Sequence, residues 1–230
     1  MKPLTSWLLK FLKWMGILIV ASAATVGFMF AYFAIPVTLA DLGYPKFQYR
    51  EGKEAHRTKD NYSAIKYYTK AATQGHLQAQ LALAEMYENG VDGDTIDPDS
   101  ETALKWYRMA ADQGHANAQF KLASLMVQSE DFKIEEYPEV ARYYGLAADQ
   151  NLARAQAALG FLYVSGLGVK RDIGEAYYWL RLFKIYAKTS EFDAQYLQWI
   201  DEVIGRISRD LAPSKLKLIE ERIQQRSSRS

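Results

Sequence analysis

The stretch "KAATQGHLQAQLALAEMY", residues 70–87, recurs twice further along the chain. It returns as "MAADQGHANAQFKLASLM" at 109–126 and as "LAADQNLARAQAALGFLY" at 146–163. Aligning the copies and extending the alignment once more brings four residues into one register, 39, 37 and 36 residues apart: Ala64, Ala103, Val140 and Ala176. Self-similarity at this period is typical of stacked supersecondary units. The sequence therefore predicts a repeat architecture, in which the fourth unit is atypical.

Each unit is interpreted as two helices joined by a short turn. The first helix runs through "SAIKYYTKAA", "TALKWYRMAA" or "VARYYGLAA", in which apolar residues recur at helical spacing. Asp60, Asp99 and Asp172 stand four residues before the aligned position, where a carboxylate can accept the unpaired amide hydrogens of a first turn. Glu136 takes this place in the third unit, and Pro138 is tolerated in the first turn that follows.

A residue that tolerates left-handed backbone is expected to end each first helix. Gly75 and Gly114 follow the paired alanines of the first two units, and glycine adopts this conformation without a Cβ clash. Asn151 holds the same position in the third unit and is the next most suitable residue. The turns into the second helices are therefore predicted at these three points.

Matched alanine, leucine and glycine residues recur on the second helices, and the small ones among them are predicted to allow close crossing of the paired helices. These positions are Ala79, Leu83, Ala84, Ala118, Leu122, Ala123, Ala155, Leu159 and Gly160, and they face the alanine pairs 71–72, 110–111 and 147–148. Aromatic residues recur on the first helices of every unit, so they are assigned to the core rather than to cofactor stacking. They are Tyr68, Trp106, Tyr107, Tyr143, Tyr144 and Trp179.

The pattern "A-L-K-W-Y-x-x-A-A-x-Q-G-x-x-x-A-Q" resembles the Sel1-like repeat, a relative of the tetratricopeptide repeat. It is matched almost fully over 103–119 and well over 64–80, whereas Val140 and Asn151 depart from it in the third unit. The segment "YVSGLGVKRD" at 163–172 resembles the linker between units of this family.

The resemblance covers about residues 60–183 and implies an all-α fold. The implied architecture is a right-handed α-solenoid of stacked helix-turn-helix repeats, whose concave face binds other proteins. No catalytic residues are carried over with the resemblance, and no cofactor is expected. Bacterial members of the family are often envelope or signalling adaptors.

The end of the chain departs from the repeat. Phe183 and Lys184 replace the alanine pair in the fourth unit, and residues 173–209 are interpreted as an ending unit. Pro213 opens a segment that is expected to form a capping helix with a polar face. The predicted organisation is a short cytoplasmic or interfacial segment at 1–14, a transmembrane helix at 15–36, a connector and leading helix at 37–59, repeats at 60–189, capping helices at 190–225 and a disordered tail at 226–230.

The N-terminal part contains an uncharged run long enough to cross a bilayer. No side chain between Lys13 and Asp41 is charged, and about 20 apolar residues suffice for a span. Met15 to Ile35 is therefore predicted to be a single N-terminal transmembrane helix. A cleaved signal peptide is the alternative, although the apolar part of such peptides runs to only about 7–15 residues. Lys10 and Lys13 favour a cytoplasmic N-terminus and an extracytoplasmic repeat domain, in a bacterial periplasm.

Ala23, Gly27 and Ala31 recur every fourth residue within this run. In a helix they share one face, on which a second helix can approach closely. The pattern predicts a homodimer or another membrane partner formed through the span. The alternative is that it reflects only the abundance of small residues in membrane helices.

Composition and motifs exclude several kinds of site. The chain has no cysteine, which excludes disulfides, thiolate metal sites and cysteine nucleophiles. Its 28 basic and 27 acidic residues are nearly balanced, which argues against nucleic-acid binding. His76 and His115 share one repeat position in separate units, so a structural or surface role is expected for both. The loop at 92–99 fails as a calcium site after three residues, and no nucleotide or hydrolase motif occurs, so no catalytic, cofactor or metal residue is predicted.

The remaining candidate for a partner site is a set of basic side chains on the first helices. Lys66, Lys70, Lys105, Arg108 and Arg142 fall at related positions, and stacking of the units aligns some of them. If these residues line the concave face, they favour an acidic peptide or protein domain, because charge complementarity governs partner choice. The alternative interpretation is a solvated outer face.

The function expected from these patterns is a membrane-anchored scaffold or adaptor that binds a protein partner through the solenoid surface. A ligand-responsive regulator of envelope signalling is a variant that the sequence does not separate from a scaffold. An envelope hydrolase is the enzymatic alternative, but regular repeats offer no obvious cleft for paired carboxylates. We therefore predict a protein that is not an enzyme.

Overall fold

The computed structural model describes residues 43–91 and 97–228 of the chain, and these two stretches form ten α-helices, two 3-10 turns and no strand. The α-helices are α3 (Pro45–Arg57), α4 (Asn61–Thr73), α5 (Leu77–Asn89), α6 (Ser100–Asp112), α7 (Ala116–Gln128), α8 (Tyr137–Asp149), α9 (Ala153–Ser165), α10 (Ile173–Tyr186), α11 (Ala194–Asp210) and α12 (Pro213–Ser227). The 3-10 turns are Ile134–Glu136 and Thr189–Glu191. The predicted all-α fold is confirmed.

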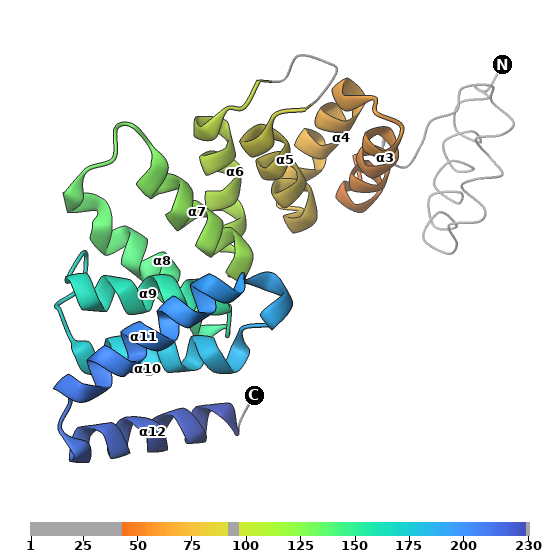
Figure 1. Cartoon of the computed structure of the whole chain (residues 1–230). Helices are drawn as coiled ribbons and strands as arrows, with labels where there is room; N and C mark the ends of the chain where they lie inside the picture. Colours follow the sequence, from red (N-terminus) through yellow and green to blue (C-terminus); the bar gives the residue numbers. More distant parts are fainter. Residues whose placement is uncertain (1–42, 92–96, 229–230) are drawn as a thin grey trace, which may run out of the picture.

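The helices from α3 to α10 stack in chain order, each packing against the one before it, as Figure 1 shows. This arrangement is an α-solenoid with α3 at one end. At the other end α11 and α12 both pack against α10 instead of continuing the stack. First helices (α4, α6, α8, α10) therefore alternate with second helices (α5, α7, α9) until the alternation ends at α10.

The predicted aspartate caps are confirmed. Asp60 accepts a hydrogen bond from the Ser63 amide at 3.0 Å, and Asp99 accepts one from the Thr102 amide at 3.0 Å. Asp172 accepts the first-turn amides of α10 in the same way. Hydrogen bonds from the side chain and then the backbone of Ser63 lower the pKa of Asp60, so its charged form is the one that begins α4.

The prediction that Glu136 caps α8 is wrong. The 3-10 turn Ile134–Glu136 runs straight into α8, and the Tyr137 amide donates to the Ile134 carbonyl. The Glu136 carboxylate instead accepts a hydrogen bond from the Lys133 amide at 3.3 Å. Pro138 lies in the first turn of α8, as predicted. A helix entered from a 3-10 turn has no extended residue at its start, so the usual capping position is missing.

The predicted turns are confirmed by their backbone conformation. Gly75 has φ of 85° and Gly114 has φ of 86°. Asn151 replaces glycine in the third unit and also adopts a left-handed conformation, with φ of 63°. These angles allow the chain to leave each first helix and enter the next helix after three residues.

A seam of alanines forms the contact between first and second helices. Ala71 and Ala72 are fully buried against Ala79, and the equivalent alanines of the next two units are buried in the same way. Five of the six aromatic residues assigned to the core are buried, and Trp106 is half-buried. At Gly160 an added Cβ would lie 2.8 Å from the Leu180 side chain, so α9 and α10 approach too closely there for a larger residue.

The predicted transmembrane helix at 15–36 lies outside the described residues, as do Ala23, Gly27 and Ala31. Within 43–91 and 97–228, none of the helices combines the length and the apolar character that crossing a bilayer requires.

The C-terminal part contains the two helices expected beyond the repeats, but the second is longer than predicted. Arg226 was assigned to a disordered tail, whereas α12 continues to Ser227. The guanidinium of Arg226 donates to the backbone carbonyl of Ala148 at 3.1 Å and to that of Asp149 at 2.8 Å. Contacts with a segment 77 residues away thus hold the last turn of α12 in place.

Candidate protein-interaction surface

One side of the first helices of units one to three is open to solvent. The aligned residues Ala64, Ala103 and Val140 are buried against the second helices. A side chain two residues further on is rotated by about 200° around the helix, so it points away from the core. We call this side the first-helix face and define it by Lys66, Lys70, Lys105, Arg108, Met109, Arg142 and Leu146, all of which are exposed.

The basic residues of the first-helix face differ in their acidic neighbours. Lys105 donates to Glu101 on its own helix at 2.8 Å, and this hydrogen bond raises the pKa of Lys105. Arg108 on α6 and Arg142 on α8 both approach Glu139, at 3.5 and 4.0 Å. Glu139 therefore links two neighbouring first helices. Such exposed pairs are individually weak, so a partner carboxylate can compete for these cations.

The α4 end of the face is the most cationic. Lys66 and Lys70 are exposed, and no acidic residue lies within α4. Lys70 lies over the ring of Tyr67, with its ammonium nitrogen 5.7 Å from the ring centre. The five basic residues are thus exposed, but acidic neighbours on α6 and α8 partly neutralise their positive charge.

Apolar side chains accompany the basic ones. Met109 and Leu146 occupy the same repeat position on α6 and α8, and they are 40% and 41% exposed. Exposed large apolar groups at one register on consecutive helices form a surface that a partner can dehydrate. The first-helix face is therefore mixed in character, with two exposed apolar side chains beside the cations.

In the fourth unit α12 covers the equivalent face. Tyr178 stands in the register of Lys66, Lys105 and Arg142, and the guanidinium of Arg222 lies 3.7 Å from the centre of its ring. Arg181 stands in the register of Arg108, and its Nε donates to Glu220 at 3.0 Å. The same side of a first helix is thus open in three units and occupied by a helix in the fourth.

Both polar and apolar contacts hold α12 against α10. The Tyr177 hydroxyl donates to Glu220 at 2.6 Å, and burial followed by this bond raises the pKa of Tyr177 to about 12. Burial alone would raise the pKa of Glu220, but hydrogen bonds from Tyr177 and Arg181 bring it below its ordinary value. Ile219 and Ile223 supply the buried apolar part of α12.

A ladder of glutamines joins the units, and sequence reasoning missed it. Gln80, Gln119 and Gln156 are each the fourth residue of a second helix, and all three are buried. Each donates through Nε2 to the last alanine carbonyl of its own first helix, at 3.0, 3.2 and 3.3 Å. A buried polar residue repeated in every copy was the available signal, because such a residue needs a partner in the core.

The ladder continues between units through glutamines of the turns. Gln113 donates to the Gln80 side-chain oxygen at 2.7 Å, and Gln150 donates to that of Gln119 at 2.9 Å. Gln156 has no such neighbour, and its Oε1 is buried without a hydrogen-bond partner. Tyr186 stands at the position in the fourth unit that Gln113 and Gln150 occupy in theirs. The ladder therefore ends where the regular repeat ends.

The structural role expected for the two histidines is confirmed. Nδ1 of His76 accepts the Ala79 amide at 3.3 Å, and Nδ1 of His115 accepts the Ala118 amide at the same distance. Each histidine is therefore the N-cap of a second helix. His76 also stacks on Tyr49 with ring centres 4.7 Å apart, and burial lowers the pKa of His76.

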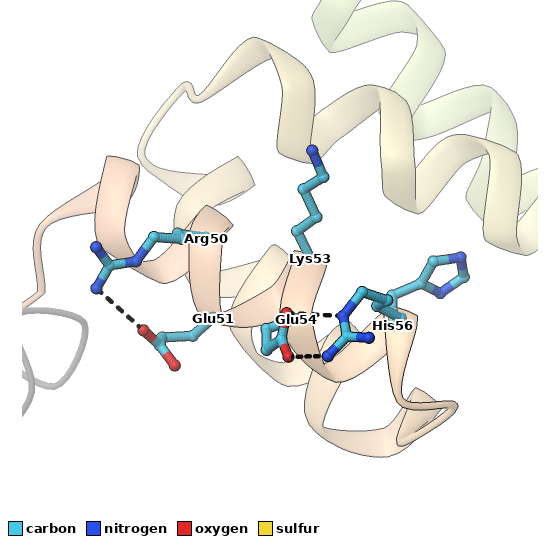
Figure 2. Close-up of a pocket in the computed structure, with 6 residues that line it drawn as sticks. Arg50, Glu51, Lys53, Glu54 and His56 are labelled. Atoms are coloured by element: carbon cyan, nitrogen blue, oxygen red, sulfur yellow. Dashed lines mark hydrogen bonds and ion pairs between the residues drawn. The ribbon is translucent and has the colours of Figure 1, made fainter.

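A surface hollow on α3 is the nearest feature to an enzyme site in the described part of the chain. Six residues of α3 line it, as Figure 2 shows: Arg50, Glu51, Lys53, Glu54, His56 and Arg57. Arg57 binds both oxygens of Glu54, and this hydrogen bonding lowers the pKa of Glu54. A carboxylate so held is a poor general base at neutral pH. Across 43–91 and 97–228, no three acidic or histidine side chains gather in a way that could hold a metal ion.

Comparison with known proteins supports the repeat assignment. The Sel1 repeat family model matches residues 39–76, 77–115 and 153–183. The first two segments contain the pairs α3–α4 and α5–α6, and the third contains α9 and most of α10. A search of the curated protein sequences finds no match.

Two crystal structures resemble the chain. One is a Sel1 repeat protein from Oxalobacter formigenes, with 26% identity and a TM-score of 0.52 over 64% of this chain and 58% of that one. The other is c5321, a protective antigen of uropathogenic Escherichia coli with an SLR fold, with 24% identity and a TM-score of 0.38 over 79% of this chain and 49% of that one. The chain thus spans about half of the length of these relatives. The chain thus contains three Sel1 repeats, carried on an α-solenoid.

Proposed function

We propose that the protein is a membrane-anchored scaffold and that its first-helix face on α4, α6 and α8 binds an acidic, amphipathic helix of a protein partner. Protein binding is the usual role of Sel1 repeats. The observation that supports the location is the docking of α12 on α10. There a helix lies on the same side of a first helix, with Arg222 on Tyr178 and Glu220 on Arg181.

The chemistry of the partner follows from the open part of the face. Lys66 and Lys70 have no acidic residue on their own helix, so carboxylates of a partner complement them. Met109 and Leu146 provide apolar area further along. The contacting face of the partner helix would carry acidic residues where it meets α4 and apolar residues where it meets α6 and α8.

Site-specific photo-crosslinking in native membranes tests this proposal. A photoreactive residue is placed singly at Lys66, Lys105 and Arg142 in the full chain, and captured proteins are identified by mass spectrometry. Matched sites at Gln78 and Asn117, which are exposed on second helices, serve as controls. We expect one discrete protein from the three first-helix sites and none from the controls.

Charge reversal provides the second part of the test. Lys66→Glu combined with Lys70→Glu removes the cationic end of the face without cutting an ion pair within α4. We expect the captured protein to disappear while the circular dichroism of the chain is unchanged. Equal capture from second-helix sites, or capture that survives charge reversal, contradicts the proposed face.

We also propose that residues 15–36 form the anchor, with the N-terminus in the cytoplasm and the repeats on the other side of the membrane. The uncharged run and the lysines before it support this topology. A reporter that is active only in the periplasm, fused after Ser230, is expected to be active. Activity only of a cytoplasmic reporter at the same point overturns the orientation.

A further inference from the structure

The exposed side of α3 carries a row of four basic residues. Lys46, Arg50, Lys53 and Arg57 are spaced by four, three and four residues, which places them on one face of the helix. All four are exposed. Gly52 is buried on the other side, where an added Cβ would lie 2.5 Å from the ring of Tyr68 on α4. The basic face of α3 therefore points away from the solenoid.

Charge is distributed unevenly along the described chain. Residues 43–73 contain seven basic and three acidic side chains, whereas residues 97–149 contain five basic and ten acidic ones. The described part of the chain therefore begins with a cationic stretch, which an acidic stretch follows further along. Such a separation produces a directed electrostatic field, which favours an anionic partner at the α3 end.

Acidic neighbours offset only part of this charge. Arg50 lies 3.3 Å from Glu51, and Arg57 lies 2.6 Å from Glu54. Figure 2 shows both pairs, with Lys53 extending away from them. Within the described part of the chain, no ion pair involves Lys46 or Lys53. These two lysines are therefore available to an external anion.

We propose that α3 lies on the membrane surface and that its basic face binds the phosphate groups of anionic lipid headgroups. The inference rests on the anchor proposed above. Only residues 37–44 separate that anchor from α3, and eight extended residues reach at most about 26–29 Å. Tyr44, which is more than half exposed, and Phe47 lie at the start of α3, where aromatic rings suit the interface between lipid and water.

The proposal does not depend on which way the anchor is oriented. Both leaflets carry phosphate groups, and a cluster of lysine and arginine beside a membrane span is attracted to anionic lipid headgroups. The contact between α3 and the bilayer would set the orientation of the solenoid relative to the membrane. Holding α3 against the bilayer leaves the rest of the solenoid to project from the surface, because α3 and α12 lie at opposite ends (Figure 1).

Fluorescence quenching in lipid nanodiscs tests the inference on the full chain. Because the chain has no cysteine, Lys53→Cys accepts a single fluorophore, and Lys217→Cys on α12 is the matched control. The discs contain phosphatidylcholine with a nitroxide on its headgroup, with or without one quarter phosphatidylglycerol. We expect quenching at residue 53 to be at least threefold stronger than at residue 217, and to increase with the anionic lipid. Adding Lys46→Gln and Arg50→Gln is expected to reduce it at least twofold, with unchanged circular dichroism.

Each other outcome identifies which proposal fails. Equal quenching at both sites, or no response to the neutralising substitutions, overturns the headgroup contact while leaving the anchor intact. Loss of quenching in 10 mM inorganic phosphate shows a site for free phosphate and likewise overturns the lipid assignment. A chain that does not enter the discs removes the anchor, and the headgroup contact with it.

Discussion

The three regular helix pairs and the C-terminal end are held together by different means. In α4 to α9 the same contacts return at each repeat, with an alanine seam and a glutamine eight residues beyond the carbonyl that it binds. In α10 to α12 the contacts join residues far apart in the chain. Tyr177 reaches Glu220, 43 residues away, and Arg226 reaches Asp149, 77 residues away.

The carbonyl groups of Ala111 and Ala148 show what this difference means. One side chain, that of Gln119, donates to the Ala111 carbonyl, whereas two side chains, those of Gln156 and Arg226, donate to the Ala148 carbonyl. Where the glutamine ladder ends, an arginine from α12 takes over part of its role. A solenoid without a following unit must satisfy its last polar groups by other means, and here a folded-back helix does so.

The largest expected effect tests whether the repeat core dominates stability. Leu122→Ala removes a side chain with 0% exposure from α7. We expect the free energy of unfolding to fall by about 2–5 kcal/mol, because apolar contacts are lost and a cavity is left. Urea denaturation followed by circular dichroism measures it. Leu218→Ala on α12 is the control, since Leu218 is 65% exposed and its change should stay within about 0.5 kcal/mol. Equal losses would remove the distinction between the two regions.

A second test compares the complete and the broken part of the glutamine ladder. Gln119→Met leaves the Ala111 carbonyl and the Gln150 side chain without this partner, and we expect a loss of about 1–3 kcal/mol. Gln156→Met should cost less, because Arg226 still binds the Ala148 carbonyl and an unpaired oxygen is removed. Denaturation midpoints of both variants decide the order. The reverse order would mean that Arg226 does not replace the ladder.

The junction between the two regions is tested by glycine substitutions. Gly160→Ala forces a Cβ against Leu180 of α10, and we expect destabilisation of about 1–3 kcal/mol from overpacking. Gly145→Ala on α8 meets no atom within 4 Å, so it should be neutral or stabilise the helix by up to about 1 kcal/mol. Thermal melting of both variants measures the difference. Similar melting temperatures would show that α9 and α10 adjust freely.

The smallest expected effect concerns the titratable cap of a regular unit. The lowered pKa of His76 means that the unfolded chain binds the proton first. Stability from this residue is therefore present above about pH 6.5 and is lost as the pH falls through the folded pKa. We expect His76→Asn, which caps α5 without titrating, to lose less stability than the parent chain between pH 7.5 and 5. The difference should be about 0.5–2 kcal/mol, the range for a cap. Parallel melting curves for the two chains would contradict this role.

Helix ends in the regular units could be predicted because they depend on neighbouring residues. Asp60 acts on an amide three residues away, and Gly75 acts through its own backbone angle. Glu136 shows where this reasoning failed. A 3-10 turn directly precedes α8, and no local sequence motif predicted that turn. The basic residues of the first-helix face could also be found from the sequence, but their ion pairs with Glu139 depend on how two helices stack.

The sequence by itself determined the period, the pairing of helices and the alanine seam, because each copy repeats the same capping, turn and alanine residues, which act on residues close to them in the chain. Only the tertiary structure decided that α12 covers the fourth first helix and leaves three others open. That choice depends on Glu220, Arg222 and Arg226 meeting groups that are about 40 to 80 residues away in the chain. Contacts over such distances leave no periodic pattern in the sequence, since their formation depends on which surfaces remain exposed after the repeats have stacked.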